Sequence, residues 1–411
     1  MKQRKVTALF FVFVMVCSLL LSTGCEKESK PVEDSIVMSY EEGEVNDPSS
    51  ASTETGDESE YVNSAEDDGL DENGEAYVTD NGVGQGNVDD GLEGSEDSNR
   101  GYYTASDYMA NPALFVPSWK GKWNPPAELL NFEKKWEAFF TPNGRLMSMA
   151  HRGDNDIYYP EDSIEGIMSC IAAGVDFLEL DVRTTSDGEL VLMHDSNITR
   201  TTNVNALRSA GVQGLPSSNT ISDWTLDELR QLRLVFETTG GKKGTNYVIP
   251  TLEDAIMVCA NKIFVFLDIK DGADWDSQIY PLIQQYKAYR SIWLPPSYST
   301  KGSTLNMYMT TIAKDSGYKA AFQAAVSPSN VATVVNTIAN YGLPKALRSG
   351  DYSTSYDTAF ASYFGKYRMS TNALYAPYNN LSTWKTLHAK GYNTLHVDDY
   401  MTLVKYIAQQ M

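Results

Sequence analysis

Short apolar segments alternate with helical patterns from residue 146 onward, and this alternation constrains the fold of the 411-residue chain more than any other feature. The segments of strand length are 146–150, 177–182, 190–193 and 263–269, and the helical ones are 162–173, 225–234 and 251–260. Asp162 and Glu165 have the spacing of a capping box at the first of these helices. Strands separated by helices pair in parallel within one sheet. The pattern therefore predicts an α/β domain over 146–411, for which we expect a (β/α)8, or TIM, barrel.

The charge of the chain is unevenly distributed along it. The chain carries 33 Lys and Arg against 54 Asp and Glu, a formal charge of −21. Residues 26–100 contain 24 acidic and three basic side chains, whereas residues 101–411 contain 30 acidic and 27 basic ones. This balance argues against nucleic acid as a partner, because phosphate backbones are bound by a basic face. We expect 26–100 to be a disordered acidic linker rather than a calcium module, because its Asp-rich runs lack EF-hand spacing.

Residues 1–25 have the layout of a signal peptide. Three basic residues precede an apolar run over 6–21, which is short for a membrane span. Small residues then lead to Cys25, as in a bacterial lipobox, although Ser22 stands where an aliphatic residue is usual. We expect the protein to be exported and held on the outer side of the bacterial cytoplasmic membrane by a lipid on Cys25. The alternatives are simple secretion, an uncleaved tether or an incidental cysteine.

Residues 101–145 form an aromatic extension that precedes the barrel domain. The helical pattern over 127–140 places its large apolar side chains broadly on one side. We expect this helix to plug one end of the domain, and a wall- or sugar-binding surface is the alternative.

Polar side chains collect where the expected strands end. His151 and Arg152 follow the first strand, and His194 follows the strand over 190–193. The carboxyl ends of parallel strands share one edge of the sheet, where barrel enzymes have their active sites. Either histidine alone would more often be structural, but their joint placement indicates a site in which they act as acid and base.

Charged pairs also lie within two of the expected strands. Glu179 and Asp181 are two residues apart, so the strand period of two puts both carboxylates on one face. Asp268 and Lys270 repeat this arrangement. Three carboxylates make an all-oxygen site suited to Mg²⁺ or Ca²⁺, and Arg152 and Lys270 supply positive charge for a phosphate. Taken singly, Asp181 could instead pair with a basic neighbour, and Lys270 could simply cap its strand.

The chain resembles the glycerophosphodiester phosphodiesterase family through a series of short motifs. In chain order they are Ala150-His151-Arg152-Gly153, Pro160-Glu161, Glu179-Leu180-Asp181-Val182, Thr185-Ser186-Asp187-Gly188, His194-Asp195, Arg200-Thr201-Thr202-Asn203, Ile249-Pro250-Thr251-Leu252-Glu253 and Asp268-Ile269-Lys270. The order and the spacing of these motifs make the resemblance specific.

The resemblance implies a metal-dependent phosphodiesterase on a TIM barrel of the phospholipase-C-like type. The roles that it implies are acid–base catalysis for His151 and His194, binding of one divalent cation, Ca²⁺ or Mg²⁺, for Glu179, Asp181 and Asp268, and phosphate binding for Arg152 and Lys270. The implied reaction releases sn-glycerol 3-phosphate and an alcohol from a glycerophosphodiester, through attack of a glycerol hydroxyl and a cyclic phosphate that water opens. A phospholipid or wall teichoic acid is an alternative substrate, and a catalytically silent surface lipoprotein that binds phosphodiesters is the alternative outside the enzymes.

The sequence departs from the family pattern in places. Asp268 stands where the family usually has Glu, which leaves the choice between Ca²⁺ and Mg²⁺ open. The Trp-Thr-Val strand common late in the family is not recognisable, although 387–399, with Gly391 and a terminal strand over 394–397, resembles its closing segment. We expect His388 and His396, which lie in that segment, to be structural. Residues 291–303 are expected to be a loop insertion that shapes leaving-group specificity.

Overall fold

The computed structural model describes only part of the chain. The described residues are 103–141, 144–238, 241–293, 324–340, 346–350, 352–374 and 379–411. The chain divides into two compact units, 1–84 and 85–411, and all described residues belong to the second. The expected signal peptide, Cys25 and the acidic linker over 26–100 therefore lie outside the described residues. No helix within the described residues is long and apolar enough to cross a membrane.

Nine described strands form one sheet, and eight of them run parallel. These eight are β1 (Met147–Ala150), β2 (Phe177–Thr184), β6 (Phe264–Ile269), β7 (Ile292–Trp293), β8 (Ala324–Val326), β9 (Ala346–Ser349), β10 (Arg368–Asn372) and β11 (Thr394–Val397). Their spatial order is β7-β6-β2-β1-β11-β10-β9-β8, so the last strand pairs with the first. This is the cyclic order of a TIM barrel, with β7 and β8 at the two ends of the paired path. The predicted parallel α/β fold is confirmed.

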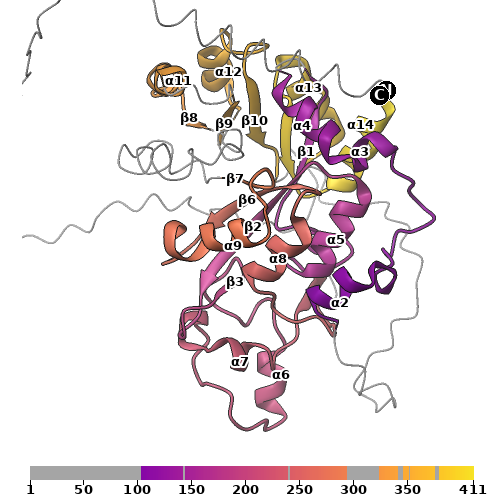
Figure 1. Ribbon diagram of the computed structural model, residues 1–411, viewed down its shortest axis with the longest axis vertical. Coiled ribbons are helices and arrows are strands. Elements are labelled where there is room, and N and C mark those ends of the chain that lie inside the picture. The colour runs from indigo at the N-terminus through magenta and orange to yellow at the C-terminus, as the bar shows by residue number, and fades with distance from the viewer. Residues whose placement is uncertain are drawn as a thin grey trace, which may run out of the picture. The chain divides into compact units, whose positions relative to one another are not determined.

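Helices connect the parallel strands and cover the sheet. They are α5 (Ile164–Ala173), α8 (Leu252–Cys259), α9 (Tyr280–Gln285), α11 (Val331–Asn340), α12 (Thr354–Phe360), α13 (Leu381–Lys390) and α14 (Tyr400–Gln409), with the short turn η3 (Trp275–Ile279). Three further elements, α6 (Val204–Ser209), η2 (Ile221–Asp223) and α7 (Leu226–Leu229), lie outside this layer. Helix α5 packs against both α8 and α14, and α14 also contacts β1. Figure 1 shows α5 and α8 side by side next to β2 and β6, where they bury the apolar faces of these strands.

The strand predicted over 190–193 is a hairpin partner and not a barrel strand. β3 (Leu190–Leu192) pairs antiparallel with the end of β2, so the expectation of a parallel strand here is wrong. The reason is the length of the connection: a few residues that turn at Gly188, with φ of 87°, can join only antiparallel strands.

A small lobe follows β3 and has its own apolar core around the buried Trp224. It contains α6, α7 and the hairpin of β4 (Val235–Thr238) with β5 (Gly241–Gly244). Figure 1 shows α6 and α7 lying beyond β3, away from the helices that cover the sheet. The helix predicted over 225–234 is therefore shorter than expected, since α7 ends at Leu229 and the chain continues into β4.

The prediction of a loop insertion over 291–303 is wrong for its first residues. Ile292 and Trp293 form β7, which is buried and pairs with β6. The polar and proline-containing sequence that follows hides this two-residue strand from a pattern search. The rest of the expected insertion, 294–303, lies outside the described residues.

The N-terminal extension packs against the helices α5 and α8 and, through its last helix, against the amino-terminal ends of the strands. Its elements are α2 (Ala105–Ala110), η1 (Pro112–Leu114), α3 (Ala127–Leu130) and α4 (Phe132–Phe140). The helix expected over 127–140 is divided at Asn131, whose side chain caps α4. Phe139 of α4 packs against Phe177, Phe264 and Trp293, with ring centroids 4.6–6.2 Å apart. Because Phe177 and Phe264 begin β2 and β6, α4 covers the end of the sheet opposite to the carboxyl ends of its strands.

Candidate active site

The carboxyl ends of β1, β2, β6 and β11 bring most of the predicted site residues together. The register pairs Asp181 of β2 with Asp268 of β6, and Met149 of β1 with His396 of β11. Glu179 lies one strand period before Asp181 and therefore on the same face of β2. The side chains of neighbouring strands consequently converge at one edge of the sheet.

The loop after β1 carries His151 and Arg152. His151 is buried, with Nδ1 2.7 Å from Oδ1 of Asp398 and Nε2 4.0 Å from Oε2 of Glu179. Arg152 has a φ of 47°, in the left-handed region that non-glycine residues rarely adopt. In this conformation its backbone N–H donates to Oε2 of Glu179 at 3.1 Å. The strained backbone thus joins the first strand's loop to the carboxylate of the second strand.

Glu179, Asp181 and Asp268 form the predicted carboxylate cluster. One carboxylate oxygen from each lies within 4.8 Å of the others. Lys270 places Nζ 3.0 Å from Oδ1 of Asp181 and 2.7 Å from Oδ2 of Asp268, and Arg152 places Nε 3.4 Å from Oδ2 of Asp181. Asp181 is fully buried, and its two oxygens make ion pairs but no hydrogen bond within the described residues. The cluster therefore holds buried acceptor oxygens that lack hydrogen-bond donors.

Negative charge exceeds positive charge around Glu179. Burial raises the pKa of Glu179 well above its ordinary value, and the carboxylates of Asp181 and Asp268 raise it further. Burial opposes the charge of Lys270, but Asp181 and Asp268 nevertheless raise its pKa, so this ammonium stays charged. Since Glu179, Asp181 and Asp268 offer only carboxylate oxygens as ligand atoms, the cluster fits a hard divalent cation such as Mg²⁺ or Ca²⁺.

His194 is connected to the cluster through a chain of ion pairs. Its Nδ1 lies 2.7 Å from Oδ1 of Asp195, whose other oxygen accepts from Nε of Arg200 at 2.5 Å. The guanidinium of Arg200 donates twice to Glu161, at 2.6 and 2.9 Å, and Glu161 also accepts from Arg152 at 3.2 Å. Burial works against the Glu161 carboxylate, but the hydrogen bond from Arg200 and the charges of both arginines lower its pKa. These alternating charges fix the loops that carry the two predicted catalytic histidines relative to each other.

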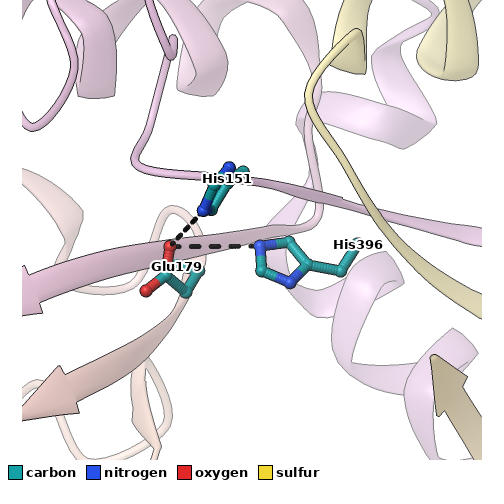
Figure 2. A group of neighbouring side chains, drawn as sticks. All are labelled: His151, Glu179 and His396. Carbon is teal, nitrogen blue, oxygen red and sulfur yellow. Dashed lines mark ion pairs between the residues drawn. The ribbon is translucent and has the colours of Figure 1, made fainter. Parts of the chain in front are cut away.

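The structure adds His396 to the site, where the sequence indicated a structural residue. His396 is buried in β11, and its Nε2 lies 3.9 Å from Oε2 of Glu179. Its ring stands nearly perpendicular to that of His151, with centroids 5.1 Å apart. Figure 2 shows the two imidazoles directed at the same carboxylate of Glu179. By contrast, His388 is half-buried in the last turn of α13, as expected for a residue outside the site.

A signal for His396 is present in the sequence. His396 and Asp398 alternate with Leu395 and Val397, so the two polar residues share one face of a buried strand. The same reasoning identified Glu179 and would have identified this pair.

Asp162 is a second residue whose role differs from the prediction. It does not cap α5, because Ser163 does so by accepting from the N–H of Gly166. Asp162 is buried, with φ of 55°, and its Oδ1 accepts from the N–H of Asp181 at 3.3 Å. Burial raises the pKa of Asp162 well above its ordinary value, and the charge of Asp181 raises it further. Burial beside Asp181 therefore favours the neutral form of the Asp162 carboxyl behind the cluster.

The arrangement is suited to moving protons beside an anionic group. His151 and His194 each have a carboxylate at Nδ1, which orients the imidazole and leaves its Nε2 edge for proton transfer. Arg152 and Lys270 lie beside the carboxylate cluster, where a phosphate and a cation could share their charges.

Known proteins resemble the segment of the chain that carries most of the candidate site residues. The sequence model of the "Glycerophosphoryl diester phosphodiesterase family" matches residues 151–287. A glycerophosphodiester phosphodiesterase of Caldanaerobacter subterraneus is 32% identical over 142 residues, which are 34% of this chain and 50% of the relative. Glycerophosphodiester phosphodiesterase 1 of Rattus norvegicus is 31% identical over 137 residues, which are 33% of this chain and 37% of that protein. The chain thus spans at most half the length of these two relatives.

Solved structures share the fold. A glycerophosphoryl diester phosphodiesterase from Parabacteroides distasonis superposes with a TM-score of 0.51 at 20% identity, covering 68% of this chain and 93% of the other. A second structure, from Silicibacter pomeroyi, gives a TM-score of 0.50 at 16% identity, covering 67% of this chain and 97% of the other. At these identities the likeness concerns the barrel fold.

Proposed function

Since residues 151–287 match the sequence model of the glycerophosphoryl diester phosphodiesterase family, we propose that the protein is a metal-dependent phosphodiesterase of this family. Its reaction hydrolyses a glycerophosphodiester to sn-glycerol 3-phosphate and an alcohol. The observation that supports this most strongly is the geometry around Glu179. Three carboxylates, two cationic side chains and the buried His151 lie within a few ångströms, and His194 is tied to them through ion pairs.

We assign the divalent cation, Ca²⁺ or Mg²⁺, to Glu179, Asp181 and Asp268. The oxygens of Asp181, which make ion pairs but no hydrogen bond within the described residues, and the raised pKa of Glu179 support this assignment, since a cation would bind these oxygens and offset the charge of Glu179. When bound, the cation supplies positive charge that offsets the charge developing on the phosphate oxygens. Arg152 and Lys270 contact the phosphate from either side of Asp181 and orient it in the site.

The two histidines move the protons. Nε2 of His151 accepts the proton of the glycerol hydroxyl that attacks phosphorus, and His194 donates a proton to the alcohol oxygen as its bond to phosphorus breaks. Water then opens the resulting cyclic phosphate while the two residues exchange roles. The partial exposure of His194, against the burial of His151, supports its place on the side of the departing alcohol.

A turnover assay tests this proposal. The purified protein is given glycerophosphocholine, glycerophosphoethanolamine, lysophospholipid or polyglycerol phosphate, each with Ca²⁺, Mg²⁺ or a chelator. We expect turnover of at least one diester in the presence of a cation and none with the chelator. His151→Ala and His194→Ala should each abolish turnover, whereas the control His388→Ala should keep the parental rate. No turnover of any substrate by protein with native circular dichroism would rule out the enzymatic function.

We further propose that the protein is exported and anchored to the membrane surface through a lipid on Cys25. The basic and apolar segment ahead of Cys25 supports this proposal. In cells, the full-length protein should sediment with membranes, and Cys25→Ser should shift it to the soluble or secreted fraction. Sedimentation unchanged by Cys25→Ser would contradict the lipid anchor.

A further inference from the structure

We propose that Asp398 and Arg348 hold the two buried histidines of the site in complementary tautomers. Asp398 keeps His151 protonated on Nδ1, so that Nε2 carries the lone pair. Arg348 keeps His396 protonated on Nε2, so that this ring presents an N–H. The catalytic meaning of the arrangement rests on the proposed function, but the tautomers themselves are independent of it.

The contact between His151 and Asp398 sets the first tautomer. Asp398 directly follows β11, and its Oδ1 lies 2.7 Å from Nδ1 of His151. An ionised carboxylate only accepts hydrogen bonds, so Nδ1 must carry the hydrogen. The same oxygen accepts from Nδ2 of Asn155 at 2.8 Å, which fixes the carboxylate in place. In the neutral imidazole the lone pair is then on Nε2, which faces Glu179.

The contact between His396 and Arg348 sets the opposite tautomer. Nη2 of Arg348 lies 3.0 Å from Nδ1 of His396, and a guanidinium only donates hydrogen bonds. A hydrogen on Nδ1 would point at this donor, so Nδ1 must accept. The amide oxygen of Asn372 lies 3.2 Å from the same Nδ1, but it accepts from Nη2 at 3.0 Å and needs no hydrogen from the ring. Arg348 itself is held against Met149 and over the ring of Phe266.

The two tautomers complement each other at one carboxylate. Nε2 of His151 and Nε2 of His396 lie 4.0 and 3.9 Å from the same oxygen of Glu179. Nε2 of His396 is buried, makes no hydrogen bond within the described residues and faces Oε2 of Glu179, so in the proposed tautomer its N–H is directed at this carboxylate (Figure 2). His396 is thus a positioning residue for Glu179, and Asp398 is a positioning residue for His151.

The tautomers also decide between two chemistries for this histidine pair. His151, Glu179 and His396 place one ligand atom each within 4.8 Å, which is close enough for a nitrogen-binding cation such as Zn²⁺. Such a site would need a lone pair on Nε2 of both histidines. Because Arg348 takes the lone pair of His396 on Nδ1, the pair does not bind a cation: Nε2 of His151 remains available for proton transfer, and His396 positions Glu179.

Nitrogen NMR of the full chain labelled with ¹⁵N-histidine tests the proposal directly. The chain has four histidines, so each can be assigned by one His→Gln variant. At pH 8, we expect His151 to show a protonated Nδ1 and an unprotonated Nε2, and His396 to show the reverse. Equal tautomers for the two rings, or movement of both Nε2 signals on addition of Zn²⁺, would overturn the proposal. These spectra do not depend on turnover, so they separate this proposal from the proposed function.

Two matched pairs of variants provide a second test. Asp398→Asn offers an amide that can donate as well as accept, so the His151 tautomer should become mixed, and kcat on the diester should fall about 100-fold or more with little change in KM. The control is Asp399→Asn, since Asp399 caps α14; it should keep kcat within about threefold of the parent. Arg348→Lys retains a donor and should keep the His396 tautomer, whereas Arg348→Met should lose it. A parental tautomer and kcat in Asp398→Asn would contradict the role of Asp398.

Discussion

Replacing Glu179 by glutamine should stabilise the protein when no divalent cation is present and should abolish its stabilisation by the cation. Glu179 is buried beside Asp181, and the burial and the neighbouring carboxylates both raise its pKa. The negative charge of Glu179 therefore destabilises the cation-free fold. Glutamine has almost the same shape and still accepts from the N–H of Arg152, so the variant removes the charge with little change in packing.

The size of the effect follows from the separations in the cluster. Two unit charges 4.8 Å apart repel by about 3.5 kcal/mol at an effective dielectric constant of 20. Asp181 is fully buried and exerts most of this repulsion, whereas Asp268 is half exposed and contributes less. The lost attraction to Lys270 offsets part of the gain. We expect a net stabilisation of about 2 kcal/mol, or roughly 5 °C in the melting temperature.

Thermal unfolding of chelator-treated protein at pH 8 measures this effect. The parent should gain about 3 kcal/mol when the cation is added at a hundred times its Kd, and Glu179→Gln should gain nothing. The control is Glu137→Gln on α4, where an exposed ion pair with Lys134 is lost; it should change stability by less than about 0.5 kcal/mol and keep the response to the cation. If Glu179→Gln were less stable than the parent when both are free of divalent cation, the cluster would not carry the excess negative charge from which we infer the cation site.

Three further predictions concern the packing of α4 against the amino-terminal ends of the strands, the contact between Glu165 and Tyr108, and the ion pairs that link His194 to the carboxylate cluster. Phe139→Ala should leave a cavity among aromatic rings and cost about 3–5 kcal/mol in urea unfolding; a loss below about 1 kcal/mol would show that α4 does not close the sheet. Glu165 accepts a hydrogen bond from the hydroxyl of Tyr108, and burial raises its pKa from 4.5 to about 7. Between pH 4.5 and pH 7 the folded state therefore keeps a proton on Glu165 that the unfolded state releases. Stability should therefore fall by up to about 3 kcal/mol as the pH rises from 4.5 to 7, and Glu165→Gln should remove this fall; an unchanged difference between parent and variant across that range would contradict the raised pKa. Arg200→Ala breaks the ion pairs behind His194 and should lower kcat about tenfold or more with a native circular dichroism spectrum, whereas a parental kcat would show that this chain does not position His194.

The first half of the barrel is predictable from the sequence because its strands are buried and apolar. β1, β2 and β6 lie within a residue or two of the predicted segments, as does α8. The later strands carry polar residues that conceal them: β9 contains Arg348 and β10 begins with Arg368. Arg368 is buried and Arg348 is partly buried in the structure, although a period-two pattern would place such residues in solvent.

The residues of the candidate site likewise fall into those that could be predicted from the sequence and those that could not. The residues near the first three barrel strands, such as His151 and Glu179, were predictable because each follows or lies in a recognisable strand. His396 comes from β11, which pairs with β1 because the sheet curls back on its first strand. Arg348 comes from β9, which lies two strands beyond β11 in the same sheet and reaches His396 with its long side chain. Asp162 was misassigned for a related reason: capping depends on local spacing, whereas its contact with Asp181 depends on the packing of the loop against β2.

The most direct test of the proposed phosphodiesterase is phosphorus NMR of the protein mixed with a set of glycerophosphodiesters. With Ca²⁺ or Mg²⁺ present, the diester signal should decline while sn-glycerol 3-phosphate accumulates, and a cyclic phosphate signal should precede it. The same sample with a chelator, or with His151→Ala in place of the parent, should keep the diester signal unchanged. A diester signal that persists for every substrate and both cations, or that declines equally with the chelator, would contradict the proposed metal-dependent phosphodiesterase.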